Sequence, residues 1–283
     1  MISPTELAAE LVSRLGVSGK PELAEVAQRI GLRIQEIDAD GFEGSLVRAL
    51  EGPKGIIAVK RSIRERSRKR FTIAHEIGHY VLPTHRTLEN VCTTDMVESW
   101  RQGNQKPELE ANEFAVELLL PARFVEKPLE LKRPSLRAIT QVANEFETSL
   151  TATALRFVGL TDLPCVVVWS EAGRARWCRG SAAFPYRLPK EAIPCEGSVA
   201  YRLFQGKEGS GDFVQVPKEC WLDRELTANV DRVLEHSVRL PNYDAVLSLL
   251  WFELHESGDV DESELLEELD PQEFTVGRRK WPR

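Results

Sequence analysis

The stretch FTIAHEIGHYVL, residues 71–82, contains the pattern HExxH between His75 and His79. Two histidines four residues apart lie on the same side of a helix, where they can bind one zinc ion through neutral imidazole nitrogens. The glutamate beside the first histidine, Glu76, can act as a base toward a water molecule at that metal. The pattern therefore predicts a zinc cofactor with His75 and His79 as metal ligands and Glu76 as the catalytic residue.

The helix that carries this pattern is predicted to span residues 62–82. Residues 62–65, SIRE, have the spacing of a capping box, and the helix should end at Leu82 because the residue before a proline leaves the α region. The run KRSIRERSRKR, residues 60–70, carries seven basic residues and one acid. We interpret this run as a solvated helix face.

A third metal ligand is expected from the helix predicted over residues 108–119, ELEANEFAVELL. At about 100° per residue, Glu108 falls within the apolar stripe of this helix. A carboxylate on the inward face needs a partner, and a metal supplies one. Asn112, one turn later at the edge of the stripe, could hydrogen-bond a ligand. The apolar stripe consists of Ala111, Phe114, Ala115, Leu118 and Leu119.

The other three glutamates of this helix, Glu110, Glu113 and Glu117, fall together on the opposite face and are expected to face solvent. His85 is the alternative third ligand. HEIGHYVLPTH has the spacing HExxHxxGxxH, except that Leu82 stands where the pattern has glycine. Leucine before proline favours an extended exit from the helix, which favours Glu108 and leaves His85 as the alternative.

The rest of the chain indicates an α+β protein with two domains. Short alternating runs before residue 60 predict a small sheet, residues 84–107 read as a polar loop, and a helix pair is predicted at 134–158. We expect a first domain at 1–160 and a smaller, β-rich mixed domain at 161–255, with a hairpin turn at Ala172-Gly173. Residues 256–283 form an acidic tail, with nine acids and no base between 256 and 273.

Composition excludes several classes of protein. The 283 residues are 42% hydrophobic and 29% charged, which is typical of globular chains, and no apolar stretch approaches the roughly 20 residues of a membrane span. Five scattered cysteines without a CxxC pair indicate reduced thiols. We therefore expect a cytoplasmic protein that has no membrane partner.

Nucleic acid is an unfavourable partner for a chain with a net charge of -7. Residues 142–157 have the residue pattern of a helix-turn-helix. However, the usual turn glycine is absent, and Arg156 is the single basic residue of the second helix. This pattern favours a structural helix pair over a DNA-binding motif, and direct DNA binding is not expected.

The two motifs together resemble the ImmA/IrrE family of zinc metallopeptidases. The resemblance rests on GIIAVKRSIRERSRKRFTIAHEIGHYVL and ELEANEFAVELLLP and covers roughly residues 1–160. It implies a zincin-like fold in which His75 and His79 bind zinc, Glu76 is the catalytic base and Glu108 is the third ligand. Residues 162–283 are similar only loosely to longer members that carry a sensor-like domain.

The expected function is that of a zinc-dependent endopeptidase. The resemblance implies a protein substrate, a helix-turn-helix transcriptional repressor, cleaved during stress or during induction of a mobile element. The strand near residues 55–59 could pair with an extended substrate backbone. The second domain is expected to sense a signal or dock the substrate. The alternative is a non-catalytic regulator that contains zinc and binds DNA, a repressor or a small ligand. An intact Glu76 speaks against that alternative, because a structural zinc needs no base.

Overall fold

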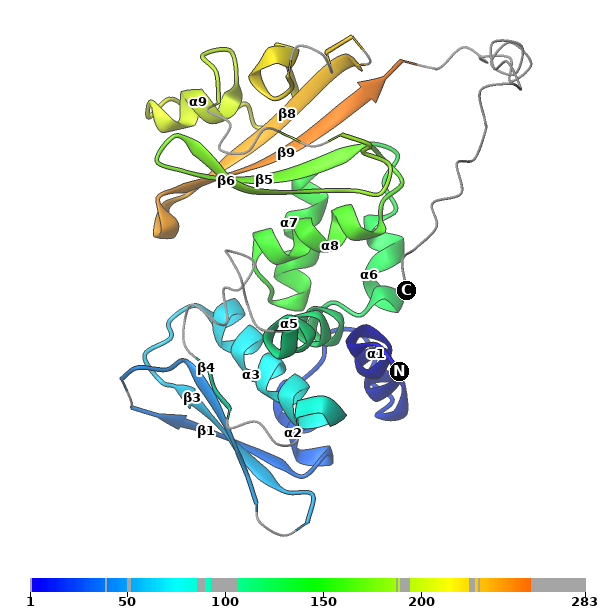
Figure 1. Ribbon diagram of the computed structural model, residues 1–283, viewed down its shortest axis with the longest axis vertical. Coiled ribbons are helices and arrows are strands. Elements are labelled where there is room, and N and C mark those ends of the chain that lie inside the picture. Colours follow the sequence, from blue (N-terminus) through cyan, green and yellow to red (C-terminus); the bar gives the residue numbers. More distant parts are fainter. Residues whose placement is uncertain are drawn as a thin grey trace, which may run out of the picture.

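The computed structural model describes residues 2–255 except 39, 50–51, 86–89, 93–105, 187, 189–193, 224–226 and 229. The acidic tail and most of the polar loop predicted from the sequence lie outside the described residues. A small sheet occupies one end of the molecule and a larger sheet the other, with a layer of helices between them (Figure 1). The predicted α+β fold class is thus confirmed, with helices dominating the first half and a sheet dominating the second. Among the described helices, none is both long enough and apolar enough to cross a membrane.

The first half begins with two helices and a four-stranded sheet. Helix α1 is capped by Ser3 and Glu6, which bond each other's backbone N–H groups in a capping box. The sheet has the order β1-β3-β2-β4, with β1 parallel to β3 and the other neighbours antiparallel. These elements are α1 (Pro4–Arg14), α2 (Leu23–Arg29), β1 (Leu32–Ile37), β2 (Gly44–Arg48), β3 (Gly55–Lys60) and β4 (Asn90–Cys92).

Two longer helices follow: α3 (Arg66–Val81) packs on this sheet, and α5 (Lys106–Leu119) packs on α3 and α1. The capping box predicted at Ser62 is wrong, because α3 begins four residues later with Glu65 as its N-cap and without a side-chain cap. The chain leaves β3 through a turn in which the N–H of Ile63 bonds the carbonyl oxygen of Lys60. That turn takes up the residues that the sequence assigns to the helix.

The basic run at residues 60–70 is not simply a solvated face, as its sequence suggests. Arg68 bonds Glu43 at 2.6 Å, and Lys69 bonds Glu36 at 2.9 Å, so both tie α3 to the sheet region. Arg66 pairs with Glu147 at 3.0 Å, in the turn between two helices of the second half. Most of the run is therefore engaged within the protein. Folding brings acids from distant segments to it, which the local charge pattern does not reveal.

Within the residues that the structure describes, the second half has three α-helices on one face of a five-stranded sheet and one on the other face. The sheet has the order β6-β5-β9-β8-β7 and is antiparallel throughout. The predicted hairpin is confirmed: Ala172 and Gly173 join β5 to β6 with φ of 48° and 72°. The elements are α6 (Ala122–Leu129), α7 (Leu136–Phe146), α8 (Leu150–Leu160), β5 (Cys165–Glu171), β6 (Arg174–Gly180), α9 (Val199–Phe204), β7 (Val214–Val216), β8 (Val230–Leu240) and β9 (Ala245–Leu254).

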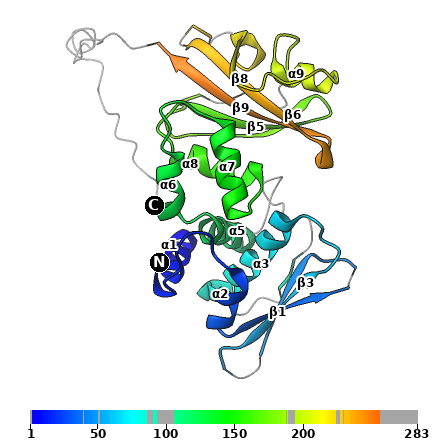
Figure 2. The ribbon, with the colours of Figure 1, turned by 180° about the vertical axis from the view of Figure 1, so that it is seen from behind.

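Both faces of this larger sheet are covered, as Figure 2 shows from behind. Val166 and Val168 of β5 pack toward α9, whereas Val167 and Trp169 pack toward α7 and α8. This alternation explains why β5 is buried along almost its whole length. The apolar faces of α6, α7 and α8 therefore belong to the core of the second half.

This packing bears on the domain boundary that the sequence places near residue 160. The first core ends at Leu119, and the helices after it share a core with residues 165–169 and 245–249. The helix pair at 134–158 thus packs on the second sheet, although it precedes the β-rich part of the sequence. The core divides the chain near residue 120.

Cys195 and Cys220 form a disulfide with their Cα atoms 4.9 Å apart. The expectation that every cysteine is reduced is therefore wrong for this pair. The two residues are 25 positions apart, and only the packing of the second half brings them together. Cys165 and Cys178 are free thiols, the first buried and the second exposed.

Candidate metal centre

Helix α3 places the side chains of the HExxH pattern in the protein interior. His75, Glu76 and His79 are completely buried. The helix is anchored by the neighbouring apolar residues Ile73, Ala74 and Ile77, which belong to the first core. The two imidazole rings stand edge to face with their centroids 4.6 Å apart, because their positions differ by one helical turn.

Gly78 determines how closely α5 approaches this helix. A Cβ atom at Gly78 would lie 3.1 Å from Cδ1 of Phe114 and 3.2 Å from the carbonyl oxygen of Ala111, closer than ordinary van der Waals contact. The glycine of the motif therefore lets α5 lie directly against α3. As a result, Glu108 and Asn112, one turn apart on α5, reach the histidines.

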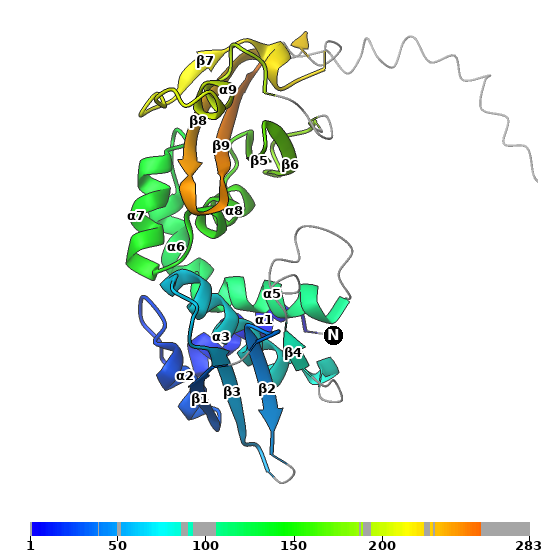
Figure 3. The ribbon, with the colours of Figure 1, turned by 90° about the vertical axis from the view of Figure 1, so that its left-hand side faces the viewer.

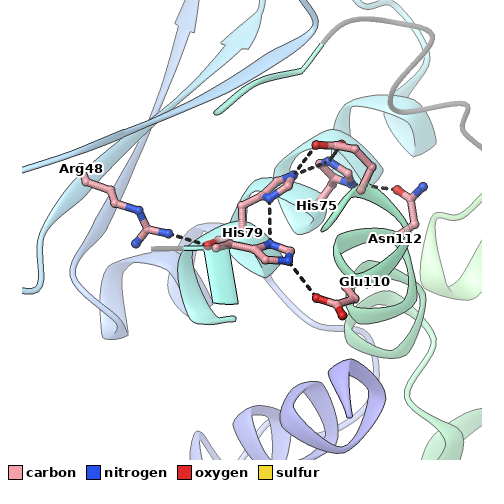
Figure 4. Close-up of polar contacts among 7 residues, drawn as sticks. Arg48, His75, His79, Glu110 and Asn112 are labelled. Carbon is pink, nitrogen blue, oxygen red and sulfur yellow. Dashed lines mark hydrogen bonds and ion pairs between the residues drawn. The ribbon is translucent and has the colours of Figure 1, made fainter. Parts of the chain in front are cut away.

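Three potential ligand atoms converge between the two helices (Figure 4). Nε2 of His75 lies 3.0 Å from Nε2 of His79 and 3.1 Å from Oε2 of Glu108. Nε2 of His79 lies 3.5 Å from Oε1 of Glu108. Among the residues that the structure describes, this trio is the group of histidine, cysteine or acidic side chains with the proximity needed to hold a metal ion.

The geometry and chemistry of this trio fit a catalytic zinc. Tetrahedral ligands at zinc distances of about 2.0–2.2 Å stand about 3.3 Å from one another. The three separations here, 3.0, 3.1 and 3.5 Å, bracket that value. Two imidazole nitrogens and one carboxylate are a set used by catalytic zinc sites, which keep a fourth position for water or substrate.

Further side chains hold the outer nitrogens of the two histidines. With Nε2 turned toward the metal, Nδ1 carries the proton and needs an acceptor. Nδ1 of His75 donates to Oδ1 of Asn112 at 2.8 Å, and Nδ1 of His79 donates to Nδ1 of His85 at 2.9 Å. His85 then carries its proton on Nε2 and donates it to Oε2 of Glu110 at 3.1 Å. A chain of hydrogen bonds therefore fixes the orientation of each ring.

The protonation states suit metal binding. Burial raises the pKa of Glu108, but the hydrogen bonds that its carboxylate makes with His75 and His79 outweigh burial and lower the pKa to about 2. Burial lowers the pKa of His79 below 6.5, although Glu108 opposes this shift. Burial likewise lowers the pKa of His85, with Glu110 opposing. At neutral pH the carboxylate is charged and these two imidazoles are neutral, as metal ligands and their partners require.

Strand β2 passes directly beside Glu76. A Cβ atom at Gly44 would lie 2.7 Å from Oε1 of Glu76 and 2.5 Å from Cγ2 of Thr72. Only glycine permits this approach of the strand to the helix. The carboxylate of Glu76 is thereby confined between α3 and β2.

Arg48 is a residue of the site region that sequence reasoning missed. Its guanidinium donates to the carbonyl oxygens of His79 and Tyr80 at 2.5 and 3.3 Å and lies 5.1 Å from the centre of the Tyr80 ring. These contacts place a cation at the C-terminal end of α3, where the helix dipole favours it. Arg48 lies on β2, far from the motif in sequence, so no local pattern signals this role.

The structure distinguishes the residues that the sequence groups as possible ligands. Glu108 lies with His75 and His79, whereas His85, the alternative ligand, stands behind His79 and contacts its outer nitrogen. Asn112 contacts the outer nitrogen of His75, the kind of contact expected of it.

The expectation that Glu110, Glu113 and Glu117 all face solvent is wrong for two of them. The Glu110 side chain is 20% exposed and is bonded to His85. Glu117 is buried, and its carboxylate accepts from the N–H of Ala122 and from Arg156 of α8. Only Glu113 is exposed. Partners that come from other segments turn these two positions inward, which a helical wheel cannot show.

Comparison with known proteins assigns the segment that contains this site to a protein family. Residues 27–158 match the family model described as the IrrE N-terminal-like domain, Peptidase M78. No curated protein matches the chain. The match includes α3 and α5, which carry the three converging ligand atoms, and the peptidases of this family are zincin-like and metal-dependent. Residues 27–158 of this chain therefore belong to the IrrE N-terminal-like, or M78, family of metallopeptidases.

Proposed function

We propose that this protein is a zinc-dependent endopeptidase with a protein substrate. His75, His79 and Glu108 are the metal ligands and Glu76 is the catalytic base. The observation that carries the proposal is the convergence of the three ligand atoms beside a buried glutamate of the same helix. The M78 family match supports it independently.

When bound, zinc supplies a Lewis acid that polarises the scissile carbonyl and lowers the pKa of water. Glu76, the buried glutamate of the HExxH pattern, would accept the proton of the attacking water. The same carboxylate then passes the proton to the amine that leaves. Gly44 and Thr72 limit the space around Glu76 and so keep the base in place.

The strand expected to pair with the substrate cannot do so. β3 lies between β1 and β2 and is hydrogen-bonded along both edges. Its backbone groups are thus already used within the sheet. The strand that approaches the base is β2, through Gly44.

The proposed substrate is a helix-turn-helix transcriptional repressor, whose cleavage would relieve repression during stress or mobile-element induction. This part of the proposal rests on the family resemblance. A helix-turn-helix protein encoded by an adjacent reading frame would be the first substrate to test.

The test uses the full chain loaded with one equivalent of zinc and incubated with that repressor. Cleavage is followed by intact-mass spectrometry, which also locates the cut. We expect cleavage by the zinc-loaded chain and none after chelation. Glu76→Gln keeps the size of the side chain but removes the proton acceptor, and it should lower the rate about 100-fold to 10,000-fold.

Glu126→Gln is the matched control, because it makes the same change at an exposed position of α6, away from the metal ligands. It should leave the rate unchanged. Zinc bound at one equivalent without cleavage of any repressor would contradict the proposal and favour the non-catalytic regulator. A Glu76→Gln chain as active as the unaltered one would mean that another group accepts the proton.

A further inference from the structure

An apolar groove of about 410 Å³ lies where the two halves of the molecule meet. Figure 3 shows α5 of the first half facing α8 and the β5 end of the second half across this junction. The wall from the first half includes Phe71, Leu109 and Val116. The wall from the second half includes Leu155 and Trp169.

The groove adjoins the candidate metal ligands. Phe71 precedes His75 by one turn of α3, and the centroids of their rings are 6.3 Å apart. Asn112 lines the groove and also accepts the hydrogen bond of His75. Leu109, which follows the ligand Glu108, is 45% exposed and lines the same groove. These contacts place the groove directly beside the candidate metal ligands.

Of the four charged side chains in the lining, Glu113 is exposed and the other three have partners within the protein. Glu65 accepts hydrogen bonds from Tyr243 and Asn242 at 2.6 and 3.0 Å. Arg68 bonds Glu43, and Arg156 bonds Glu117. Sites for small ligands usually aim a few polar groups at the ligand to fix its orientation. These three charges are used otherwise and Glu113 is the remaining one, so apolar contact is the main interaction that the groove offers.

The wall from the second half is an aromatic cluster. Trp169 stacks on Trp177 with ring centroids 5.9 Å apart and meets Tyr243 edge to face at 5.6 Å. Trp169 is buried and Tyr243 is 39% exposed, so Tyr243 carries the accessible part of this cluster, and rings held in this way have little freedom left to lose on binding.

We propose that this groove is a specificity subsite that takes two neighbouring apolar side chains of the protein substrate, on one side of the scissile bond. Its volume lies within the range of about 300–1,000 Å³ that holds whole small ligands, so it has room for more than one side chain. The proposal rests on the proposed peptidase function. It gives the second half a direct part in choosing the substrate.

The test measures peptide binding separately from cleavage. The full zinc-loaded Glu76→Gln chain is mixed with a synthetic pool of peptides randomised at six central positions, and the bound peptides are identified by mass spectrometry. We expect bound peptides to be enriched in adjacent large apolar residues. A selected peptide should bind at least about tenfold more tightly than its variant with two serines at those positions.

Two further substitutions connect this preference to the groove. Ala152→Trp, on the α8 wall, should fill the groove and remove the preference, and Leu109→Ser should weaken it from the α5 wall. Gly159→Trp adds the same indole to α8 at a position outside the groove lining, where an added Cβ atom meets no neighbour, and should leave the preference intact. Circular dichroism and zinc content establish that each chain is folded and loaded.

The possible outcomes separate this proposal from the proposed function. Peptides bound without apolar enrichment, or a preference that survives Ala152→Trp, would overturn the subsite. Binding of the apolar dye anilinonaphthalene sulfonate that Ala152→Trp abolishes, without any peptide preference, would overturn it in favour of a small ligand. Failure of the unaltered chain to cut its selected peptides would instead count against the peptidase function and leave the binding result standing.

Discussion

Replacing Gly44 by alanine should impair catalysis while leaving the metal site intact. The added methyl group would lie 2.7 Å from Oε1 of Glu76, whereas ordinary contact begins at 3.4 Å. The carboxylate must therefore retreat by about 0.7 Å, or β2 must move away from α3 by a similar amount. Gly44 contacts neither histidine of the site, so zinc should remain bound.

The structure also gives the expected size of the effect. Misplacing a catalytic group by about 1 Å costs on the order of 100-fold in rate, so we expect a loss of about 10-fold to 100-fold. The same methyl group would lie 2.5 Å from Cγ2 of the buried Thr72. Overpacking of this kind costs about 1–3 kcal/mol of stability.

A second substitution separates the two effects. Thr72→Ser removes Cγ2 but keeps the hydroxyl that donates to the carbonyl oxygen of Arg68. The double variant with Gly44→Ala should regain part of the lost stability in urea denaturation, because one clash is relieved. It should not regain the rate, because the clash with Glu76 remains.

The assay measures repressor cleavage, zinc content and the free energy of unfolding for the single and double variants. Gly159→Ala is the matched control, since its new methyl group meets no neighbour. A Gly44→Ala chain with unchanged rate and stability would refute the confinement of Glu76 by β2. Loss of zinc from that chain would show that the strand supports the metal ligands and not only the base.

Four further predictions concern the metal centre and the junction of the two halves. Glu108→Ala should abolish stoichiometric zinc binding in a competition assay with a chelating dye, whereas Glu113→Ala should not change it. His85→Ala should weaken zinc binding by about 10-fold to 100-fold, as expected for an outer partner of a ligand, and loss as large as that of Glu108→Ala would make His85 a ligand. Acidification should release zinc below about pH 6.5, because His79, whose pKa is lowered by burial, must take up a proton, while Glu108 with a pKa of about 2 stays ionised. A chain ending at Leu160 should aggregate in light scattering, because the apolar faces of α7 and α8 lose the sheet that covers them; a monomeric, zinc-binding fragment would contradict this packing.

As the pH falls, His79 should take up a proton before Glu108 does, and the linkage of protonation to folding gives the reason. A histidine with a lowered pKa in the folded state binds protons more readily when unfolded, so stability falls as the pH drops below about 6.5. The lowered pKa of Glu108 contributes stability that is lost only as the pH falls toward about 2. A zinc-release curve centred near the pKa of Glu108 would contradict this order.

Local patterns in the sequence were sufficient for features that depend on neighbouring residues. A spacing of four places His75 and His79 on one side of a helix, and the structure has them there because helical geometry is fixed by the backbone. The inward position of Glu108 follows from the same periodicity and agrees with its contacts to both histidines. The hairpin at Ala172-Gly173 was predictable because its turn needs a positive φ that Gly173 tolerates, although Ala172 also adopts one.

Only the tertiary structure decided which distant segments meet. Glu110 looks solvent-exposed until η1, the short 3-10 helix at residues 83–85, brings His85 to it. The partner of Glu117 is Arg156, 39 residues away. In both cases the energetic benefit is an ion pair or hydrogen bond between segments, and no periodicity within either segment encodes its partner.

The same reason explains why the sequence alone does not show which sheet the helix pair at 134–158 packs on. The apolar stripes of α7 and α8 show that these helices must be covered, but periodicity does not say whether α5 or the second sheet covers them. The sequence by itself determined the motif, the helices that carry it and the faces that must be buried. The fold decided the partner of each face, because hydrophobic burial is non-directional and any apolar surface of matching shape can satisfy it.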